Sequence, residues 1–134
     1  MRSGRLSFYA VFLLCLMQLF SCSSGVEPAE VVCRVAKQSY DYLLEGRFEE
    51  FVDCHYQPDS IPASYREQLI ANVRMFVAQQ KSDHGGMVKV DVIRAEVDTA
   101  LHSANAFLSV QYGDSTCEEI LVPMVERESV WYLR

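Results

Sequence analysis

A glycine between two amphipathic segments, within residues 39–56, is the feature that most constrains how this chain can fold. The apolar residues on both sides of it, continued by His55, recur at the three- and four-residue spacing of one helical face: Tyr40, Leu43, Leu44, Phe48, Phe51 and Val52. Because glycine adopts positive φ readily, Gly46 can end the first helix at little energetic cost. The pattern predicts two helices, the second leaning back on the first after Gly46.

The flanking residues predict the other helix boundaries. The first helix is expected to begin near Pro28, since proline suits a first helical turn. Two prolines make residues 57–62 a loop. Ser64 and Glu67 have the spacing of a capping box, which predicts the start of a third helix that ends before His84. The residues of this helix expected to be buried are Leu69, Val73, Phe76 and Val77.

The C-terminal part alternates between apolar and polar residues, as strands with one buried face do. The apolar positions are Val88, Val90 and Val92, then Ile93, Ala95 and Val97, then Ala104, Ala106, Leu108, Val110 and Tyr112. The change of parity after Val92 predicts a β-bulge. Gly113 begins a hairpin turn, a third strand returns over 116–126 with Pro123 at an edge or bulge, and 130–133 close the sheet. Helices followed by antiparallel strands predict an α+β fold.

Residues 42–51, Tyr-Leu-Leu-Glu-Gly-Arg-Phe-Glu-Glu-Phe, resemble the helix–break–helix opening of the nuclear transport factor 2-like fold, also called cystatin-like. Trp131 in the closing strand is a second point of resemblance, which covers residues 28–134. The resemblance implies N-terminal helices packed in a strongly bent antiparallel sheet, together shaped like a cone. Large side chains are then expected either to fill the core or to line the mouth of the cone; the candidate lining residues are Tyr40, Phe51, His55, Phe76, Phe107 and Trp131.

The N-terminus predicts export and lipid attachment. Arg2 and Arg5 precede an uncharged apolar run over 6–20, the pattern of a secretory signal. Residues 19–22, Leu-Phe-Ser-Cys, resemble the lipobox of bacterial lipoproteins, in which the cysteine is acylated after cleavage. We therefore expect a signal peptide over 1–21, a tether over 22–28 starting at the lipidated Cys22, and one domain over 29–134. The alternatives are an uncleaved membrane anchor and ordinary cleavage beside Cys22.

Together, the lipobox and the domain resemble small lipoproteins of Bacteroidetes-type bacteria. This resemblance implies a protein anchored by lipid in the cell envelope, on the periplasmic side of the outer membrane. Such a compartment is oxidising, so the remaining cysteines could form one bridge. We expect Cys33–Cys54, with Cys54–Cys117 as the alternative and unpaired thiols as the competing interpretation.

No catalytic residue follows from the resemblance. Steroid isomerases of this fold use a tyrosine and an aspartate, and the matching positions here hold Ser39 and a residue near Ala63. Cys54 and His55 are adjacent, but neighbours on a helix point about 100° apart and cannot act as a nucleophile–base pair. The dispersed histidines predict no metal site, and nothing in the sequence calls for a cofactor.

The acidic balance of the chain, with a net charge of −6, argues against nucleic-acid binding. We expect a non-catalytic domain that binds a protein or small-molecule partner, held to the membrane by its lipid. The alternative is an isomerase- or hydratase-like enzyme that acts on a small hydrophobic substrate inside the cone.

Overall fold

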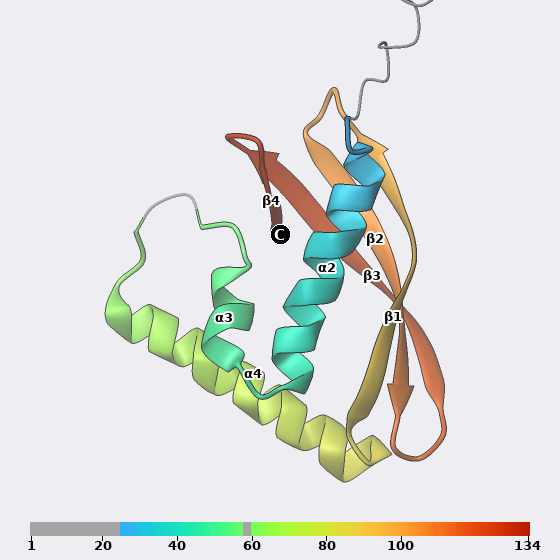
Figure 1. Ribbon diagram of the computed structural model, residues 1–134. Coiled ribbons are helices and arrows are strands. Elements are labelled where there is room, and N and C mark those ends of the chain that lie inside the picture. The colour runs from blue at the N-terminus through green and yellow to red at the C-terminus, as the bar shows by residue number, and fades with distance from the viewer. Residues whose placement is uncertain (1–24, 58–59) are drawn as a thin grey trace, which may run out of the picture.

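The computed structural model describes residues 25–57 and 60–134. Its helices are α2 (Pro28–Leu44), α3 (Phe48–Asp53) and α4 (Ala63–His84), and its strands are β1 (Met87–Asp98), β2 (Ser103–Tyr112), β3 (Cys117–Arg127) and β4 (Val130–Leu133). The strands form an antiparallel sheet in the order β1-β2-β3-β4. The sheet is curled, and α2 lies along its concave face (Figure 1). The domain is α+β, as predicted.

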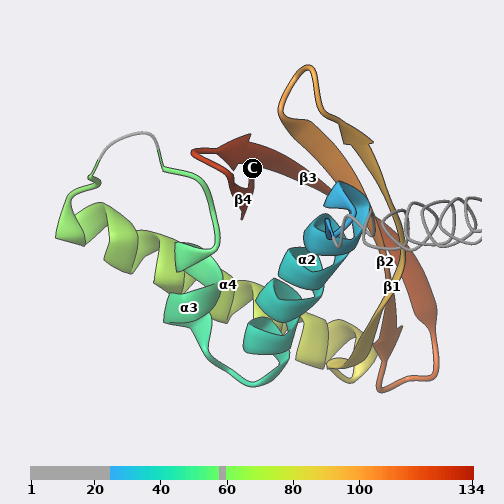
Figure 2. The same ribbon diagram turned by 45° about the horizontal axis from the view of Figure 1, so that its top comes forward.

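The core lies between α2 and the concave face of the sheet. The α2 side of this core consists of Val32, Ala36, Ser39 and Leu43, which recur at helical spacing. Ser39 is buried without cost because its hydroxyl donates to the carbonyl oxygen of Val35 at 2.8 Å. On the sheet side of the core, every second residue of β2 from Ala104 to Tyr112 is buried, as the alternation predicted. Figure 2 shows α3 and α4 outside this layer, at one end of α2.

The helix break occurs where the sequence predicted it. Gly46 has φ +75°, and its amide donates to the carbonyl of Leu43 at 3.2 Å. The amide of Arg47 donates to the carbonyl of Tyr42 at 2.8 Å. These paired bonds are a Schellman motif, which satisfies the last carbonyls of α2 and turns the chain into α3.

The start and the packing of α4 differ from the prediction. Pro62 occupies the N-cap position, without a side-chain cap, and α4 begins at Ala63, so Ser64 lies inside the first turn and the capping box does not form. Ile70 is the buried residue of this helix, whereas Phe76 is 49% exposed. The reason is that α4 packs on α3 and the start of β1 rather than across the sheet, so only a narrow stripe of it is covered.

Two features of the sheet were predicted correctly, whereas the expected burial of Val88 and Ile93 was wrong; Ile93 lies at the bulge and is 46% exposed. The register of β1 against β2 shifts between Val92 and Arg94, at the predicted bulge. Pro123 accepts the amide of Arg134 at 2.9 Å, directly after β4 ends, so the proline stands where β3 loses its β4 partner and becomes an edge. A second shift between Met87 and Lys89 turns Val88 outward, and Val88 is 62% exposed rather than buried.

Neither predicted disulfide is present: Cys33, Cys54 and Cys117 are free. Cys33 lies about 16 Å from the end of α2, whereas the short α3 rises only about 9 Å before it reaches Cys54. The two cysteines are therefore at different heights along the paired helices, which prevents a Cys33–Cys54 bridge. The carbonyl of Cys54 accepts a hydrogen bond from the amide of Leu133, and the β3 partner of Leu133, Met124, lies about 23 Å along the strand from Cys117. Burial also raises the pKa of the Cys33 thiol.

The N-terminal predictions fall outside the described residues. The signal peptide, Cys22 and the start of the tether precede residue 25. Within residues 25–57 and 60–134, no helix is long and apolar enough to cross a membrane.

Candidate functional site

A pocket of about 370 Å³ lies between α3, α4 and the C-terminal end of β4, and we call it the apolar pocket. It is about the size of a small-molecule site. Most of its surface comes from apolar and aromatic side chains. Its lining residues are Phe51, Val52, His55, Tyr56, Gln57, Ile61, Tyr65, Leu69, Asn72, Val73 and Arg134.

A short backbone bridge builds the wall of this pocket. The amide of Leu133 donates to the carbonyl of Cys54 at 2.8 Å, and the amide of Tyr56 donates to the carbonyl of Leu133 at 2.7 Å. His55 is therefore held in a parallel bridge opposite Leu133. This bridge joins the end of α3 to β4, so the pocket is made from parts of the chain that are distant in sequence.

Three aromatic rings form a row of edge-to-face contacts that runs from the core to the pocket. The ring centroids of Tyr40 and Phe51 are 5.7 Å apart, and those of Phe51 and His55 are 5.0 Å apart, both edge to face. This geometry is favoured between aromatic rings and fixes their orientation. Burial raises the pKa of the Tyr40 phenol. Tyr40 thus supports the pocket from beneath, while Phe51 and His55 form part of its surface.

His55 is the imidazole of this pocket, and its orientation follows from its hydrogen bond. Its Nδ1 lies 3.0 Å from the carbonyl oxygen of Phe51. Because a carbonyl oxygen only accepts, Nδ1 carries the proton of this bond. In the neutral ring, Nε2 then remains an acceptor that a ligand hydroxyl or amide could use.

A second pocket of about 480 Å³ shares the wall formed by His55, Tyr56 and Gln57, and we call it the polar pocket. Its other lining residues are Asp53, Arg127, Glu128 and Tyr132. The rings of Tyr56 and Tyr132 are 5.8 Å apart at an angle of 56°. The guanidinium carbon of Arg127 lies 5.2 Å from the centroid of Tyr56, within the range of a cation–π contact.

A strained turn lies at the rim of the polar pocket. Glu128 and Ser129 join β3 to β4 with φ values of +51° and +63°. A tight hairpin favours positive φ at both central residues, but glycine and asparagine adopt it far more easily than glutamate or serine. The backbone therefore carries strain where Glu128 enters the pocket lining.

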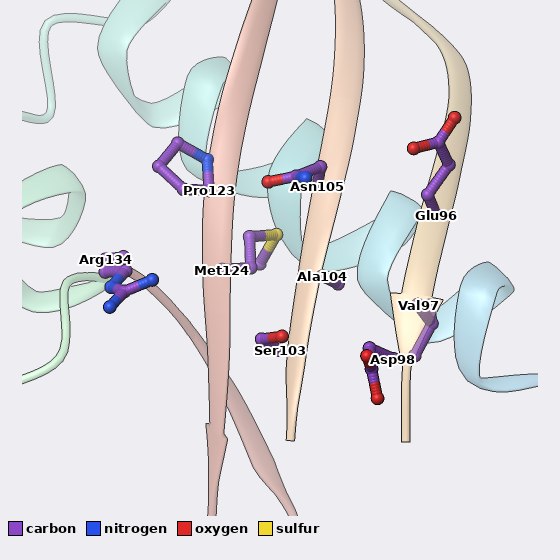
Figure 3. A pocket seen from close by; sticks show the side chains of 9 residues that line it. All are labelled: Glu96, Val97, Asp98, Ser103, Ala104, Asn105, Pro123, Met124 and Arg134. Atoms are coloured by element: carbon purple, nitrogen blue, oxygen red, sulfur yellow. The ribbon is translucent and has the colours of Figure 1, made fainter. Parts of the chain in front are cut away.

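A third hollow, of about 320 Å³, lies on the face of the sheet away from α2 (Figure 3). Glu96 and Asp98 project from β1 on one side of it, and Arg134 lies beyond β3 on the other. Asp98 already accepts the amide of Leu101 at 3.0 Å, and Glu96 lies 3.5 Å from Arg94. Within the described part of the chain, no cluster of three potential metal ligands occurs here or elsewhere.

A histidine and an aspartate, His84 and Asp114, meet at the β2–β3 turn, where α4 ends. His84 Nδ1 is 3.3 Å from Asp114 Oδ2, and the His84 ring is 5.0 Å from that of Tyr112. The hydroxyl and amide of Thr116 donate to Asp114 and hold the pKa of that carboxyl below its usual value. These residues do not line the three pockets described above, and their contacts are those of a packed turn.

The structure brings only some of the predicted cavity residues together. Phe51 and His55 line the apolar pocket, and Trp131 is core, at 7% exposure. Phe107 is on the opposite face of the sheet, with the guanidinium carbon of Arg94 3.9 Å from its ring centroid. Phe76 is on the exposed side of α4. Phe107 and Phe76 do not line the apolar pocket because they point away from it: no other described element covers the outer face of β2 or that side of α4.

The residues that sequence reasoning missed are the tyrosines around His55. Tyr56, Tyr65 and Tyr132 line the pockets, but they lie at a predicted helix end, in the predicted third helix and in the closing strand, and none of these patterns marks a cavity. The available signal was the placement of Tyr56 directly after the predicted cavity residue His55.

Comparison with known proteins gives a structural likeness. No protein-family model matches the sequence, and no curated protein does. A crystal structure from Campylobacter jejuni, named "Putative NTF2-like transpeptidase", superposes with a TM-score of 0.59 at 12% identity, covering 75% of this chain and 94% of that one. The fold is NTF2-like. At this identity the likeness concerns the fold alone, and it agrees with the helix–break–helix resemblance at Gly46.

Proposed function

We propose that this protein is a lipid-anchored component of the bacterial cell envelope whose NTF2-like domain binds a small apolar ligand without catalysis. The observation that carries the binding proposal is the apolar pocket between α3, α4 and β4, with its volume of about 370 Å³. Its few polar groups, among them the imidazole of His55 and the amide of Asn72, suit the orientation of a ligand.

The composition of the lining favours binding over catalysis. An isomerase moves a proton between two substrate atoms and commonly needs a base together with a group that stabilises the developing charge. The described lining of the apolar pocket contains His55, the phenols of Tyr56 and Tyr65 and the guanidinium of Arg134, but no Asp or Glu side chain to act as a carboxylate base. His55 could serve as a base, so the enzyme alternative is tested below.

The lipid anchor in this proposal is supported by the sequence. Cys22 follows an uncharged run and a serine, and the tether after it is short. Acyl chains contribute about 0.8 kcal/mol per buried methylene, so more than one chain holds a protein on a membrane without a spanning helix. The first described helix begins at Pro28, close to the proposed anchor in sequence.

The test is to identify what the protein carries. We would purify the full chain from membranes into lipid nanodiscs, extract it with organic solvent and compare the extracted small molecules by mass spectrometry. Val73→Phe adds bulk to the apolar pocket. Met75→Phe adds the same ring to α4 at a 70% exposed position and is the matched control.

An apolar molecule recovered from the wild type and Met75→Phe, and lost from Val73→Phe, supports the proposal. Equal recovery from all three proteins, or none from the wild type beyond the empty nanodisc, contradicts it. His55→Gln separates binding from catalysis. A binding protein carries the same molecule with either residue, whereas an enzyme would carry substrate in the variant and product in the wild type.

A further inference from the structure

The polar pocket has a different chemistry from its apolar neighbour. Its volume of about 480 Å³ is within the range of small-molecule sites. Tyr56 and Tyr132 are both half-buried, and their rings meet at 56° with centroids 5.8 Å apart. The pocket therefore has two aromatic faces set at an angle, each with a polar hydroxyl at its tip.

The remaining lining residues offer both donors and acceptors of hydrogen bonds. Arg127 supplies only donors, Asp53 and Glu128 supply acceptors, and the amide of Gln57 supplies both. A ligand that suits this mixture has groups that both donate and accept. Hydroxyl groups do so, whereas a phosphate or an ammonium group does only one.

The charges in the pocket nearly balance. Arg66 pairs with Asp53 through two hydrogen bonds, of 3.1 Å from Nε and 2.9 Å from Nη2. The charges that remain are those of Arg127 and Glu128, which are opposite. An anion would meet Glu128 and a cation would meet Arg127, so the balance favours a neutral ligand.

We propose that the polar pocket binds a neutral pyranose sugar, alone or as a unit of a glycan. The apolar C–H face of the sugar ring would pack on Tyr132 and on the part of Tyr56 that the guanidinium of Arg127 leaves free. Its hydroxyls would bond to Gln57, Arg127 and Glu128. This site is distinct from the apolar pocket, because Tyr132, Arg127 and Glu128 line the polar pocket and do not line the apolar one.

The probes for this site are glucose, N-acetylglucosamine, cellotriose and chitotriose, with glucose 6-phosphate as a charged comparison. Binding to the full chain in nanodiscs is measured by saturation-transfer NMR and calorimetry. Saturation transfer to the C–H protons of at least one neutral sugar is expected. Tighter binding of a trimer than of its monomer identifies a glycan as the source, and equal binding identifies a free sugar.

Variants connect any binding to this pocket. Tyr132→Ala and Gln57→Ala are each expected to weaken sugar binding tenfold or more, and Tyr132→Phe is expected to keep most of it. Tyr65→Ala removes a tyrosine from the apolar pocket alone and is the matched control, with unchanged sugar binding expected. Gln57→Ala keeps the proposal testable if Tyr132→Ala fails to fold, because no side-chain hydrogen bond of the described fold uses Gln57.

Three results overturn the proposal: no saturation transfer from any neutral probe, tighter binding of glucose 6-phosphate than of glucose, or unchanged binding in both Tyr132→Ala and Gln57→Ala. Val73→Phe separates this proposal from the previous one. It blocks the apolar pocket only, so sugar binding should persist in it whether or not an apolar ligand exists.

Discussion

The phenol of Tyr112, at the end of β2, donates a hydrogen bond of 2.8 Å to Glu118 Oε2 at the start of β3. Tyr112 is 7% exposed, and its removal from water, together with the bond to Glu118, raises the pKa of the phenol to about 12. The neutral phenol is the form that donates, so the contact holds only while Tyr112 keeps its proton. The bond lies beside His84, where the end of α4 docks on the sheet.

This shift predicts a pH dependence of stability. The pKa of Tyr112 is raised in the folded state, so its stabilisation is complete below the unfolded value, about 10, and is lost as pH rises toward 12. Tyr112→Phe should be less stable than the wild type by about 1 kcal/mol at pH 7. Urea unfolding at pH 7, 10 and 11 measures this difference, which should shrink at the two higher values. A difference that stays constant with pH would show that the bond does not control the titration.

The close approach of two glycines predicts a strict requirement at Gly113. Its amide donates to the carbonyl of Gly86 at 2.9 Å, and a Cβ built on it would overlap the carbonyl oxygen of Gly85. Because that oxygen belongs to the backbone, α4 would have to move. Gly113→Ala should lower the free energy of unfolding by about 2 kcal/mol or more, as thermal denaturation would measure. Gly25→Ala, where no atom lies within 4 Å, is the control and should change nothing.

Strain in the β3–β4 turn predicts a stabilising substitution. Ser129 has φ +63°, which glycine adopts without penalty. Ser129→Gly should therefore raise the free energy of unfolding by about 1 kcal/mol. Ser82→Gly makes the same chemical change inside α4 and should lower it by about 0.5–1 kcal/mol. Chemical denaturation of both variants gives the two values, and a loss of stability in Ser129→Gly would mean that the turn is unstrained.

The fold could be predicted from the sequence because apolar residues recur at a different spacing in the helices than in the strands. The change from a spacing of three and four residues to alternation separates helices from strands, and Gly46 and Gly113 mark two of the turns. The α4 helix was the weak point. Its apolar residues do not form one clear stripe, so the sequence could not distinguish the buried Ile70 from the exposed Phe76.

The site was less predictable because it depends on a contact between distant residues. His55 lies in no regular strand and pairs with Leu133 through an isolated bridge. No periodic pattern in the sequence predicts such a bridge. Tyr56 and Tyr132 meet only because of it. The resemblance to the cone-shaped fold identified Phe51 and His55 as candidate lining residues, but the rest of the pocket comes from this tertiary contact.

The lipid anchor gives a prediction outside the described residues. Cys22 follows the apolar run with a small residue before it, so it is expected to be the acylated N-terminus of the mature protein. Cys22→Ala should abolish incorporation of an alkyne-labelled palmitate, while Cys33→Ala should leave it intact. In-gel fluorescence of the purified proteins compares them. Labelling of Cys22→Ala at the wild-type level would disprove the assignment.

The break between α2 and α3 gives the last prediction. Gly46 has φ +75°, and no atom lies within 4 Å of a Cβ built on it, so a side chain would be penalised by backbone conformation alone. A β-branched residue is the least tolerant of positive φ, and Gly46→Val should lower the free energy of unfolding by about 2 kcal/mol. Asparagine tolerates this region better than other non-glycine residues. Gly46→Asn should therefore cost clearly less than Gly46→Val in urea unfolding. Equal losses in the two variants would mean that contact with neighbouring groups, and not the Schellman geometry, sets the requirement at this position.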